Sequence, residues 1–315
     1  MTTPNPPWDT APFPKVTATQ AEEICDRHDL GRLHLGTIPP CGNVNAIFAL
    51  GPDLILRVSK DIPEAIRGTI SESIAAPAAR RAGVRTPRLI AFDNSREILN
   101  TPYTIYERVD GIELTRIDAS AHEFPHIWRQ VGRELSRLHH GVVDVEDPQH
   151  LLRDSQRPDP EPFVEAADFL SEDHKRWFRR CFDRLRPAVE NASSFRRLTH
   201  GDAQSNNVLI RNHEFVALID WGGAGWCDGT IEFYNMPARV LPYVVDGYRE
   251  EAPFDDDETA EARILFNQLA AAISEPMWDG LGVLSWHGRP NTRRLIEILA
   301  FYATDLPATW RRWIG

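Results

Sequence analysis

The sequence has few of the residues that mark several protein classes. Of its 315 residues only 4 are cysteine and 3 are methionine, and no two cysteines form a Cys-x-x-Cys pair. That pattern excludes a small disulfide-stapled scaffold and predicts reduced thiols. No apolar run reaches the roughly 18 residues of a membrane-spanning helix, and residues 1–15 are Pro-rich without the apolar core of a signal peptide. We therefore expect a cytoplasmic protein that does not bind a membrane.

Basic residues are scarce relative to acidic ones. Lysine and arginine total 35 and aspartate and glutamate 46, so the formal net charge is −11. This balance argues against nucleic-acid binding, because contacts to phosphates need a basic face. An acidic protein can instead attract small cationic molecules. The hydrophobic fraction of 42% and the charged fraction of 26% are typical of a globular chain.

The first third of the chain is dominated by β-type runs. A Gly-Pro-Asp turn at 51–53 joins two of them into an antiparallel hairpin. One long helix is predicted to end at Gly83, and Pro77 inside it indicates a kink or a break. The strands are predicted over 33–38, 43–50, 53–59, 86–93 and 103–109, and the helices over 17–29 and 62–82.

The pattern becomes mainly helical after residues 108–112. We interpret this segment as a hinge between an N-terminal lobe, residues 1–107 with an extended arm at 1–15, and a C-terminal lobe, residues 113–315. The predicted fold class is α+β, with a small antiparallel lobe carrying one long helix and a larger, mainly helical lobe. A cleft between two lobes is a common ligand site. Helices are predicted over 121–140, 161–190 (one or two), 257–273 and 289–306.

One stretch of the C-terminal lobe concentrates chemically useful side chains. His200-Gly201-Asp202 is followed by Asn207 and, thirteen residues later, by Asp220. The apolar runs 208–210 and 215–219 between these last two residues predict a β-hairpin. Because a hairpin folds back on itself, Asn207 and Asp220 should lie together, with Asp202 one short loop away.

Two carboxylates and an amide oxygen at one place suit phosphoryl transfer. Asn207 and Asp220 offer the hard oxygen ligands that Mg²⁺ prefers, and such an ion completes its shell with nucleotide phosphates. Asp202 can then accept a proton from a hydroxyl group that attacks phosphorus. The alternative is that His200 and Asp202 cap a turn and that Asp220 ends a strand.

These residues, together with Ile219-Asp220-Trp221, resemble the aminoglycoside phosphotransferase family of small-molecule kinases. The resemblance implies a bilobal protein-kinase-like fold with ATP or GTP as the phosphate donor. It also implies that Asp202 is the catalytic base and that Asn207 and Asp220 are the Mg²⁺ ligands.

The resemblance extends to the N-terminal lobe. It implies that Arg57 stands where kinases hold a lysine against the phosphates, with Lys60 as a rival, and that Glu72 is its acidic partner, with Glu64 as a rival. An ordinary exposed arginine and glutamate are the alternative. The loop at 36–43 would cover the phosphates of the nucleotide, and the backbone of the hinge would bind the edge of its adenine. The nucleotide-binding residues implied in these two segments are Gly36, Gly42, Asn43, Glu107 and Val109.

The sequence says least about the acceptor, the molecule that would receive the phosphate. Only a short segment separates Asp220 from the next helix-like residues, so no platform for a peptide is predicted. Residues 246–262 carry eight acids and one base and would suit a polyamine-like ligand, although a solvated helix start explains them as well. The Trp-rich stretch at 278–286 would stack on a flat substrate or belong to the core. The candidate acceptor-binding residues are Asp228, Glu232 (for which the family also suggests a structural role), Asp255, Asp256 and Asp257.

The sequence therefore predicts a Mg²⁺-dependent kinase that phosphorylates a hydroxyl of a small, cationic molecule. An antibiotic such as an aminoglycoside is the leading acceptor, with resistance as the outcome. The alternatives are a kinase of a choline-like or sugar-like metabolite and a nucleotide-binding pseudokinase that binds a partner. The kinase interpretations imply no protein partner.

Overall fold

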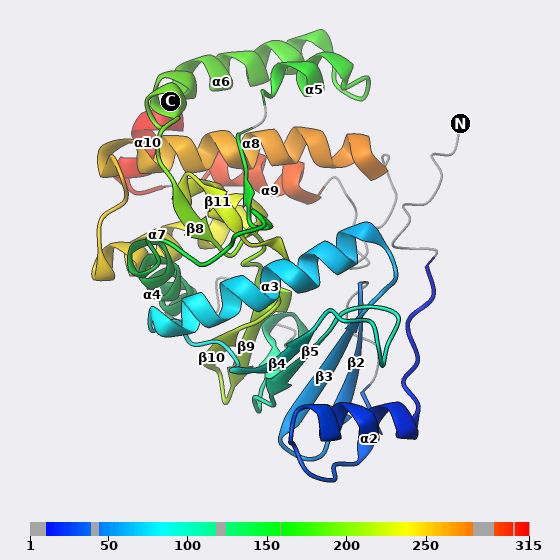
Figure 1. The fold of residues 1–315 in the computed structure, drawn as a ribbon. Helices are drawn as coiled ribbons and strands as arrows, with labels where there is room; N and C mark the ends of the chain where they lie inside the picture. Colours follow the sequence, from blue (N-terminus) through cyan, green and yellow to red (C-terminus); the bar gives the residue numbers. More distant parts are fainter. Residues whose placement is uncertain are drawn as a thin grey trace.

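The computed structural model describes residues 11–38, 44–117, 124–157, 159–279, 293–304 and 306–314. Its architecture is α+β, with a β-sheet at one end and a stack of helices at the other (Figure 1). The α+β class predicted from the sequence is confirmed. In the described residues no helix is long and apolar enough to cross a membrane.

The sheet near the N-terminus is antiparallel and has the order β1-β2-β3-β5-β4. Helix α2 (Ala18–Arg27) begins with a capping box, in which Thr17 and Gln20 bind each other's backbone N–H groups. Its buried residue Ile24 shares a small hydrophobic core with Leu56 and Ile105 of the sheet. The strands are β1 (Leu35–Thr37), β2 (Asn45–Leu50), β3 (Leu54–Ser59), β4 (Leu89–Asp93) and β5 (Tyr103–Glu107).

Helix α3 (Pro63–Arg81) lies between the sheet and the stack of helices (Figure 1). It continues through Pro77, so no break occurs there. Buried alanines around Pro77, among them Ala75 and Ala79, pack into the main core of the helical part. This burial offsets the hydrogen bond that a proline inside a helix loses.

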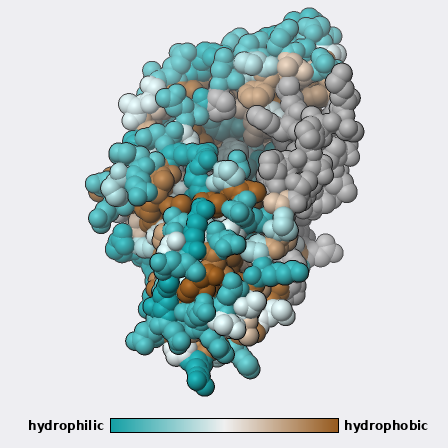
Figure 2. Space-filling model, turned by 45° about the vertical axis from the view of Figure 1, so that its right-hand side comes forward, coloured by the Kyte–Doolittle hydropathy of each residue, from teal (hydrophilic) through white to brown (hydrophobic). Residues whose placement is uncertain are grey.

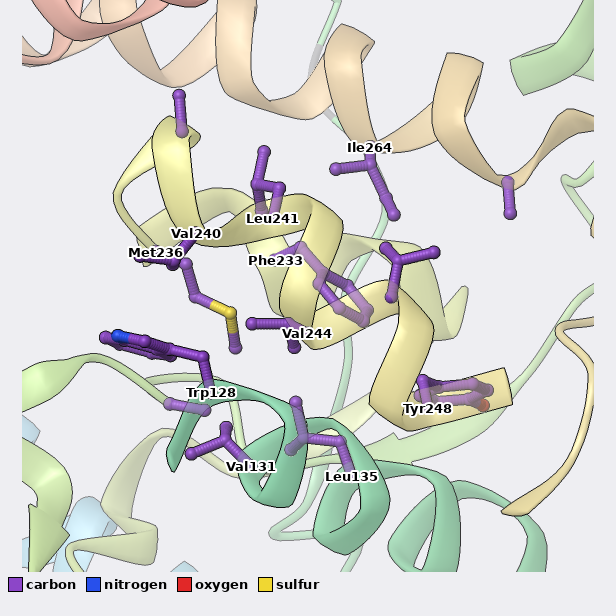
Figure 3. Close-up of a cluster of buried hydrophobic side chains, with 14 of the residues drawn as sticks. Trp128, Val131, Leu135, Phe233, Met236, Val240, Leu241, Val244, Tyr248 and Ile264 are labelled. Carbon is purple, nitrogen blue, oxygen red and sulfur yellow. The ribbon is translucent and has the colours of Figure 1, made fainter. Parts of the chain in front are cut away.

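The helical part is organised around a very close crossing of α4 and α7 (Figure 3). A Cβ atom on Gly132 would lie 2.0 Å from the Val244 carbonyl oxygen, and one on Gly247 would lie 1.9 Å from the Arg129 carbonyl oxygen. Only glycine fits at both positions. Trp128 of α4 packs beside this crossing (Figure 3). The helices are α4 (Pro125–Gly141), α5 (Glu161–Ala166), α6 (Glu172–Asn191), α7 (Leu241–Glu251), α8 (Ala260–Asp279), α9 (Arg293–Tyr302) and α10 (Ala308–Ile314).

Two small sheets and several 3-10 turns complete the described structure. One sheet has the order β10-β9-β6 and the other β7-β11-β8. The strands are β6 (Ile112–Glu113), β7 (Arg153–Asp154), β8 (Arg197–Thr199), β9 (Val208–Arg211), β10 (Glu214–Leu218) and β11 (Gly225–Cys227). The 3-10 turns are η1 (Leu114–Arg116), η3 (Ser205–Asn207), η4 (Trp221–Gly223), η5 (Gly229–Asn235), η6 (Ala238–Val240) and η7 (Asp257–Thr259).

The described surface is mostly hydrophilic. In the face shown in Figure 2, the hydrophobic residues that are visible gather mainly toward the middle. The large hydrophobic side chains that are exposed in the described residues are Phe13, Ile112, Val143, Ile296 and Leu299. The cysteines described, Cys25, Cys181 and Cys227, are buried free thiols.

Candidate active site

The hairpin predicted after Asn207 is present. Strands β9 and β10 pair antiparallel, and their connection places Asn212 and His213 in the left-handed region at φ 53° and 63°, as a tight hairpin turn requires. At the open end the Ile219 N–H donates to the Asn207 carbonyl oxygen at 3.0 Å. Asn207 and Asp220 therefore lie at the same end of the hairpin.

The loop around Gly201 touches the segment after Asp220 backbone to backbone. Gly201 has φ 79°, and a Cβ there would lie 2.0 Å from the Gly223 carbonyl oxygen. Asp220 itself has φ 67°, a left-handed conformation that costs energy for a non-glycine residue. These two backbone features hold Asp202 and Asp220 on the same cavity.

Three amide groups hold the carboxylate of Asp202. Gln204 Nε2 and Asn235 Nδ2 donate to Oδ1 at 2.7 and 3.0 Å, and Asn207 Nδ2 donates to Oδ2 at 2.8 Å. Burial raises the pKa of Asp202 to about 7, and the charge of Asp220 adds to the rise. A carboxyl group with this pKa suits general-base catalysis near neutral pH.

The backbone of this loop is held from behind by Glu232. Its carboxylate accepts the N–H groups of His200 and Gly201 at 2.6 and 3.1 Å. Burial lowers the pKa of His200, so the ring is neutral. Its Nδ1 accepts the Asp202 N–H, which assigns the ring proton to Nε2 and the donated hydrogen bond to the Ile219 carbonyl oxygen.

Arg57 of β3 connects the sheet to helix α3 and to Asp220, which follows the hairpin. Its guanidinium forms an ion pair with Glu72, which is buried, and donates to Asp220 Oδ1 at 2.9 Å. Burial alone would lower the pKa of Arg57, but Glu72 and Asp220 outweigh it and raise that pKa. Of the rival residues, Lys60 lies over the Phe13 ring, and Glu64 lines the cavity from the first turn of α3.

Asp202, Asp220 and Glu72 face one cavity of about 830 Å³. The same cavity extends along η5, α8 and α9. Reactive carboxylates therefore open onto a space of the size that binds small ligands.

A family model described as the phosphotransferase enzyme family matches residues 42–262, which include the His200–Asp202 loop, the hairpin and the Arg57–Glu72 pair. The chain belongs to the phosphotransferase enzyme family. The resemblance drawn from the sequence is thereby confirmed, and the protein is a small-molecule kinase of this family. No curated protein matches the sequence.

Several solved structures share the fold at low sequence identity. An aminoglycoside 2'-phosphotransferase-IIIa in a GDP complex has a TM-score of 0.60 at 13% identity, over 92% of this chain and 99% of that chain. A choline/ethanolamine kinase family protein from Mesorhizobium loti has a TM-score of 0.56 at 15% identity, over 94% and 98%. A spectinomycin phosphotransferase with ADP and spectinomycin has a TM-score of 0.55 at 14% identity, over 96% and 98%. The predicted kinase-like fold is confirmed.

The carboxylates expected to bind the acceptor have other partners in this phosphotransferase. Asp228 is buried between Arg157 and Arg263, at 2.6 and 2.8 Å. Burial would raise the pKa of Asp228, but the two arginines outweigh it and hold the pKa below its ordinary value.

The acidic run is likewise paired with side chains of its own lobe. Asp255 binds Arg197 at 2.6 Å, Asp257 binds Arg249 at 3.0 Å, and Asp256 accepts the Thr259 hydroxyl at 2.6 Å. None of these residues, nor Asp228 or Glu232, is among the described residues lining the cavity. In the described structure these carboxylates bind side chains of the acidic run's surroundings or, for Glu232, the backbone of the His200–Asp202 loop, and their part in acceptor binding stays a prediction.

The remaining nucleotide-binding candidates lie in the sheet and after it. Gly36 pairs with Ala49 between β1 and β2, whereas Gly42 and Asn43 lie outside the described residues. The Glu107 carboxylate accepts the Arg88 N–H at 2.9 Å. Val109 follows β5 and is half-buried. The Trp-rich stretch at 278–286 lies outside the described side chains.

Sequence reasoning missed Asn235 and Arg294, which hold Asp202 from the side of η5 and α9. Asn235 donates to Asp202, and its Oδ1 accepts from Arg294 Nη2 at 2.7 Å. Asn235 stands three residues after Glu232 on η5. That spacing places both on neighbouring positions of one turn, a signal that was available in the sequence.

The residues present fit a Mg²⁺ ion. The Asn207 Nδ2 donates to Asp202, which leaves the amide oxygen as its acceptor group. Asp220 lines the cavity with 39% of its side chain exposed. An amide oxygen and a carboxylate are donors that suit Mg²⁺ when phosphates complete the shell.

Proposed function

We propose that this protein transfers the γ-phosphate of ATP or GTP to a hydroxyl group of a small molecule, with Mg²⁺ bound by Asn207 and Asp220. The proposal is carried by Asp202 and Asp220 on one cavity, with Asn207 bound to Asp202 and with the Arg57–Glu72 pair bound to Asp220. Solved structures of similar fold hold GDP or ADP, which supports a nucleotide donor.

The reaction needs one proton acceptor and stabilised phosphate charge. Asp202 accepts the proton of the acceptor hydroxyl as its oxygen forms a bond to the γ-phosphorus. The bond from that phosphorus to the β,γ-bridging oxygen breaks, and the nucleoside diphosphate leaves with the electron pair. Gln204, Asn207 and Asn235 orient Asp202, and Arg57 neutralises phosphate charge. A bound Mg²⁺ supplies further charge stabilisation.

Several acceptors are compatible with this chemistry. An aminoglycoside, with antibiotic resistance as the outcome, and a choline-like metabolite both have counterparts among the structural neighbours. A sugar-like metabolite is a further alternative. The residue-level support for a polycation is the acidic run, but its Asp255 and Asp257 are paired with arginines and are not among the described residues that line the cavity. A pseudokinase is disfavoured by the complete Asp202, Asn207 and Asp220 set.

The test is nucleotide turnover with product identification. The protein is incubated with ATP or GTP, Mg²⁺ and a panel of hydroxylated compounds, and a phosphorylated product is identified by its mass. Asp202→Ala should abolish turnover and leave nucleotide binding intact. The matched control is Asp183→Asn on α6, whose side chain is exposed. Turnover in Asp202→Ala equal to that of the parent would exclude Asp202 as the base.

A further inference from the structure

Helix α8 carries two amide side chains where it packs against η5. This contact is largely apolar, and Ile264 of α8 points toward Phe233 of η5 (Figure 3). Between Ile264 and Leu269, which are fully buried, stand Asn267 and Gln268, and Gln268 is only 4% exposed. A buried amide group needs hydrogen-bond partners, because an unpaired one costs free energy. The partners of these two amides therefore indicate what they do.

The partners of both amides include backbone carbonyl groups of η5 and of the residue after it. Asn267 Nδ2 donates to the Thr230 carbonyl oxygen at 3.1 Å. Gln268 Nε2 donates to the carbonyl oxygens of Phe233 and Met236 at 2.6 and 2.9 Å. Both of these partners can only accept, so the orientation of the Gln268 amide is determined and both of its N–H groups are used.

The two bonds from Gln268 lie at the end of η5, where the backbone needs them. The last carbonyl groups of a helix have no partner within the helix, and η5 ends at Asn235. Gln268 binds one carbonyl group before Asn235 and one after it. Arg294 donates to the carbonyl oxygen of Tyr234, which lies between them. The backbone on both sides of Asn235 is thus held by side chains of α8 and α9.

The residue held in this way contacts the base. Asn235 Nδ2 donates to Asp202 Oδ1 at 3.0 Å, and its Oδ1 accepts Arg294 Nη2 at 2.7 Å. Glu232, which binds the backbone of the His200–Asp202 loop, stands three residues earlier on η5. A 3-10 helix has three residues per turn, so both side chains leave η5 on the same side. A rotation or shift of η5 would therefore move Asn235 away from Asp202.

Gln268 has no direct route to the reacting atoms. Asp202 and Asn235 line the cavity, and Gln268 is not among the described residues that do so. Any effect of its amide on the reaction must then pass through the backbone of η5. Such an effect changes the orientation of the base, on which the rate of the chemical step depends, and leaves the binding of nucleotide unchanged.

We propose that Gln268 is a positioning residue for phosphoryl transfer. By binding the carbonyl groups on both sides of Asn235, it fixes the place from which Asn235 orients the Asp202 carboxylate. This inference rests on the proposed function and adds to it a residue of α8 that acts on the base without contacting the acceptor.

The first test removes the two donors and keeps the size of the side chain. Gln268→Met should lower kcat by about threefold to tenfold with the nucleotide KM unchanged. Gln268→His keeps one ring N–H as a donor and should retain part of the rate. Nucleoside diphosphate release is measured with ATP or GTP and Mg²⁺, with water, kanamycin or choline as the acceptor. Circular dichroism sets an assay temperature at which each variant is folded.

The matched control makes the same chemical change elsewhere in the helical part. Gln130 of α4 is half-buried, and its Nε2 donates to Glu134 Oε1 at 2.9 Å. It is not among the described residues that line the cavity. Gln130→Met should therefore leave kcat at the parent value, even where it lowers the temperature of unfolding.

The second test separates positioning from packing. If Gln268 acts through Asn235, the two residues act in series, and their substitutions are not additive. The double variant Gln268→Met with Asn235→Ala should then have the kcat of Asn235→Ala to within about twofold. A side chain that only packs would instead lower the rate by the same factor in both backgrounds. Should Gln268→Met fail to fold, Gln268→His takes its place in the same cycle.

The outcomes also separate this inference from the proposed function. An unchanged kcat in both Gln268 variants, or factors that multiply in the double variant, would overturn the inference. The proposed function stands in either case if the parent transfers phosphate and Asp202→Ala does not. Absence of nucleoside diphosphate release by the parent with every acceptor would overturn the proposed function, and the inference with it.

Discussion

Two arginine–carboxylate clusters, one beside the five-stranded sheet and one inside the helical part, differ in how much of each reaches solvent. In the first, Arg57 binds Glu72 and Asp220, and the Asp220 side chain is 39% exposed. In the second, Asp228 binds Arg157 and Arg263, and the three side chains are 6%, 9% and 0% exposed. Both clusters pair arginine with carboxylates, and Arg57 and Glu72 of the first are largely buried as well, so the difference lies at Asp220.

The difference distinguishes a carboxylate that can bind a ligand from a carboxylate that only stabilises the fold. A partly exposed carboxylate on a cavity can still bind a cation, whereas an enclosed one is committed to its two arginines. Breaking an enclosed ion pair leaves an uncompensated buried charge, and this is strongly destabilising. The comparison predicts that substitution of the partly exposed Asp220 affects turnover and that substitution of the enclosed Asp228 affects stability.

The largest effect is expected at the open cluster. Asp220→Asn should reduce kcat/KM on the order of 10³-fold, because it removes the carboxylate proposed to bind the Mg²⁺ ion that would stabilise the phosphate charge. The free energy of unfolding should change by less than about 1 kcal/mol, since the carboxylate is partly exposed. Steady-state kinetics and urea denaturation measure the two quantities. A large loss of stability with little loss of activity would break the comparison.

The enclosed cluster should show the reverse. Asp228→Asn leaves Arg157 and Arg263 without their carboxylate and should lower the free energy of unfolding by about 3–5 kcal/mol. At temperatures where the variant is folded, its kcat/KM should stay close to that of the parent. Asp255→Asn, which removes a more exposed partner from Arg197, is the control and should cost about 1 kcal/mol or less.

A smaller effect is expected at Asn235, which connects η5 of the helical part to Asp202. Asn235→Ala removes one hydrogen bond to the Asp202 carboxylate and should lower kcat by about tenfold, the value of a hydrogen bond to a charged group. Nucleotide KM and the free energy of unfolding should hardly change. Asn235→Ser, which retains a donor, should recover part of the rate. A change confined to stability would mean that Asn235 only packs.

The smallest effect is a pH dependence of stability. The pKa of Asp228 is lowered in the folded protein, so its contribution is fully present above the unfolded-state pKa of about 4. That contribution is lost as the pH falls through the lower, folded-state pKa. The difference in unfolding free energy between the parent and Asp228→Asn should therefore shrink as the pH falls below about 4. A difference that is constant with pH would contradict this assignment.

The sequence predicts what is local and misses what depends on packing. The turn between Asn207 and Asp220 is determined by a short hairpin, so the convergence of these residues follows from their spacing. The ion pairs of the acidic run at 246–262 could not be predicted in this way, because its partners Arg129, Arg137 and Arg197 are far away in the chain. Which acids a protein neutralises is decided by tertiary contacts.

Helix α7 and the hydrogen bond of Arg294 to Asn235 illustrate the same limit. Gly247 is a poor helix former, and its reason for being there, the contact with the Arg129 carbonyl oxygen, appears only when α4 is in place. Arg294 lies 92 residues after Asp202 in the sequence and reaches it through Asn235. No local pattern connects these residues.

The glycine-to-glycine crossing of α4 and α7 has a consequence for engineering the enzyme. Backbone touches backbone at Gly132 and Gly247, so no neighbouring side chain is able to yield when a methyl group is added. Next to it, the Tyr248 hydroxyl lies 3.0 Å from His139 Nδ1, close behind the loop support at Glu232. A mutagenesis library for new acceptors should leave both glycines untouched and place its diversity on α9.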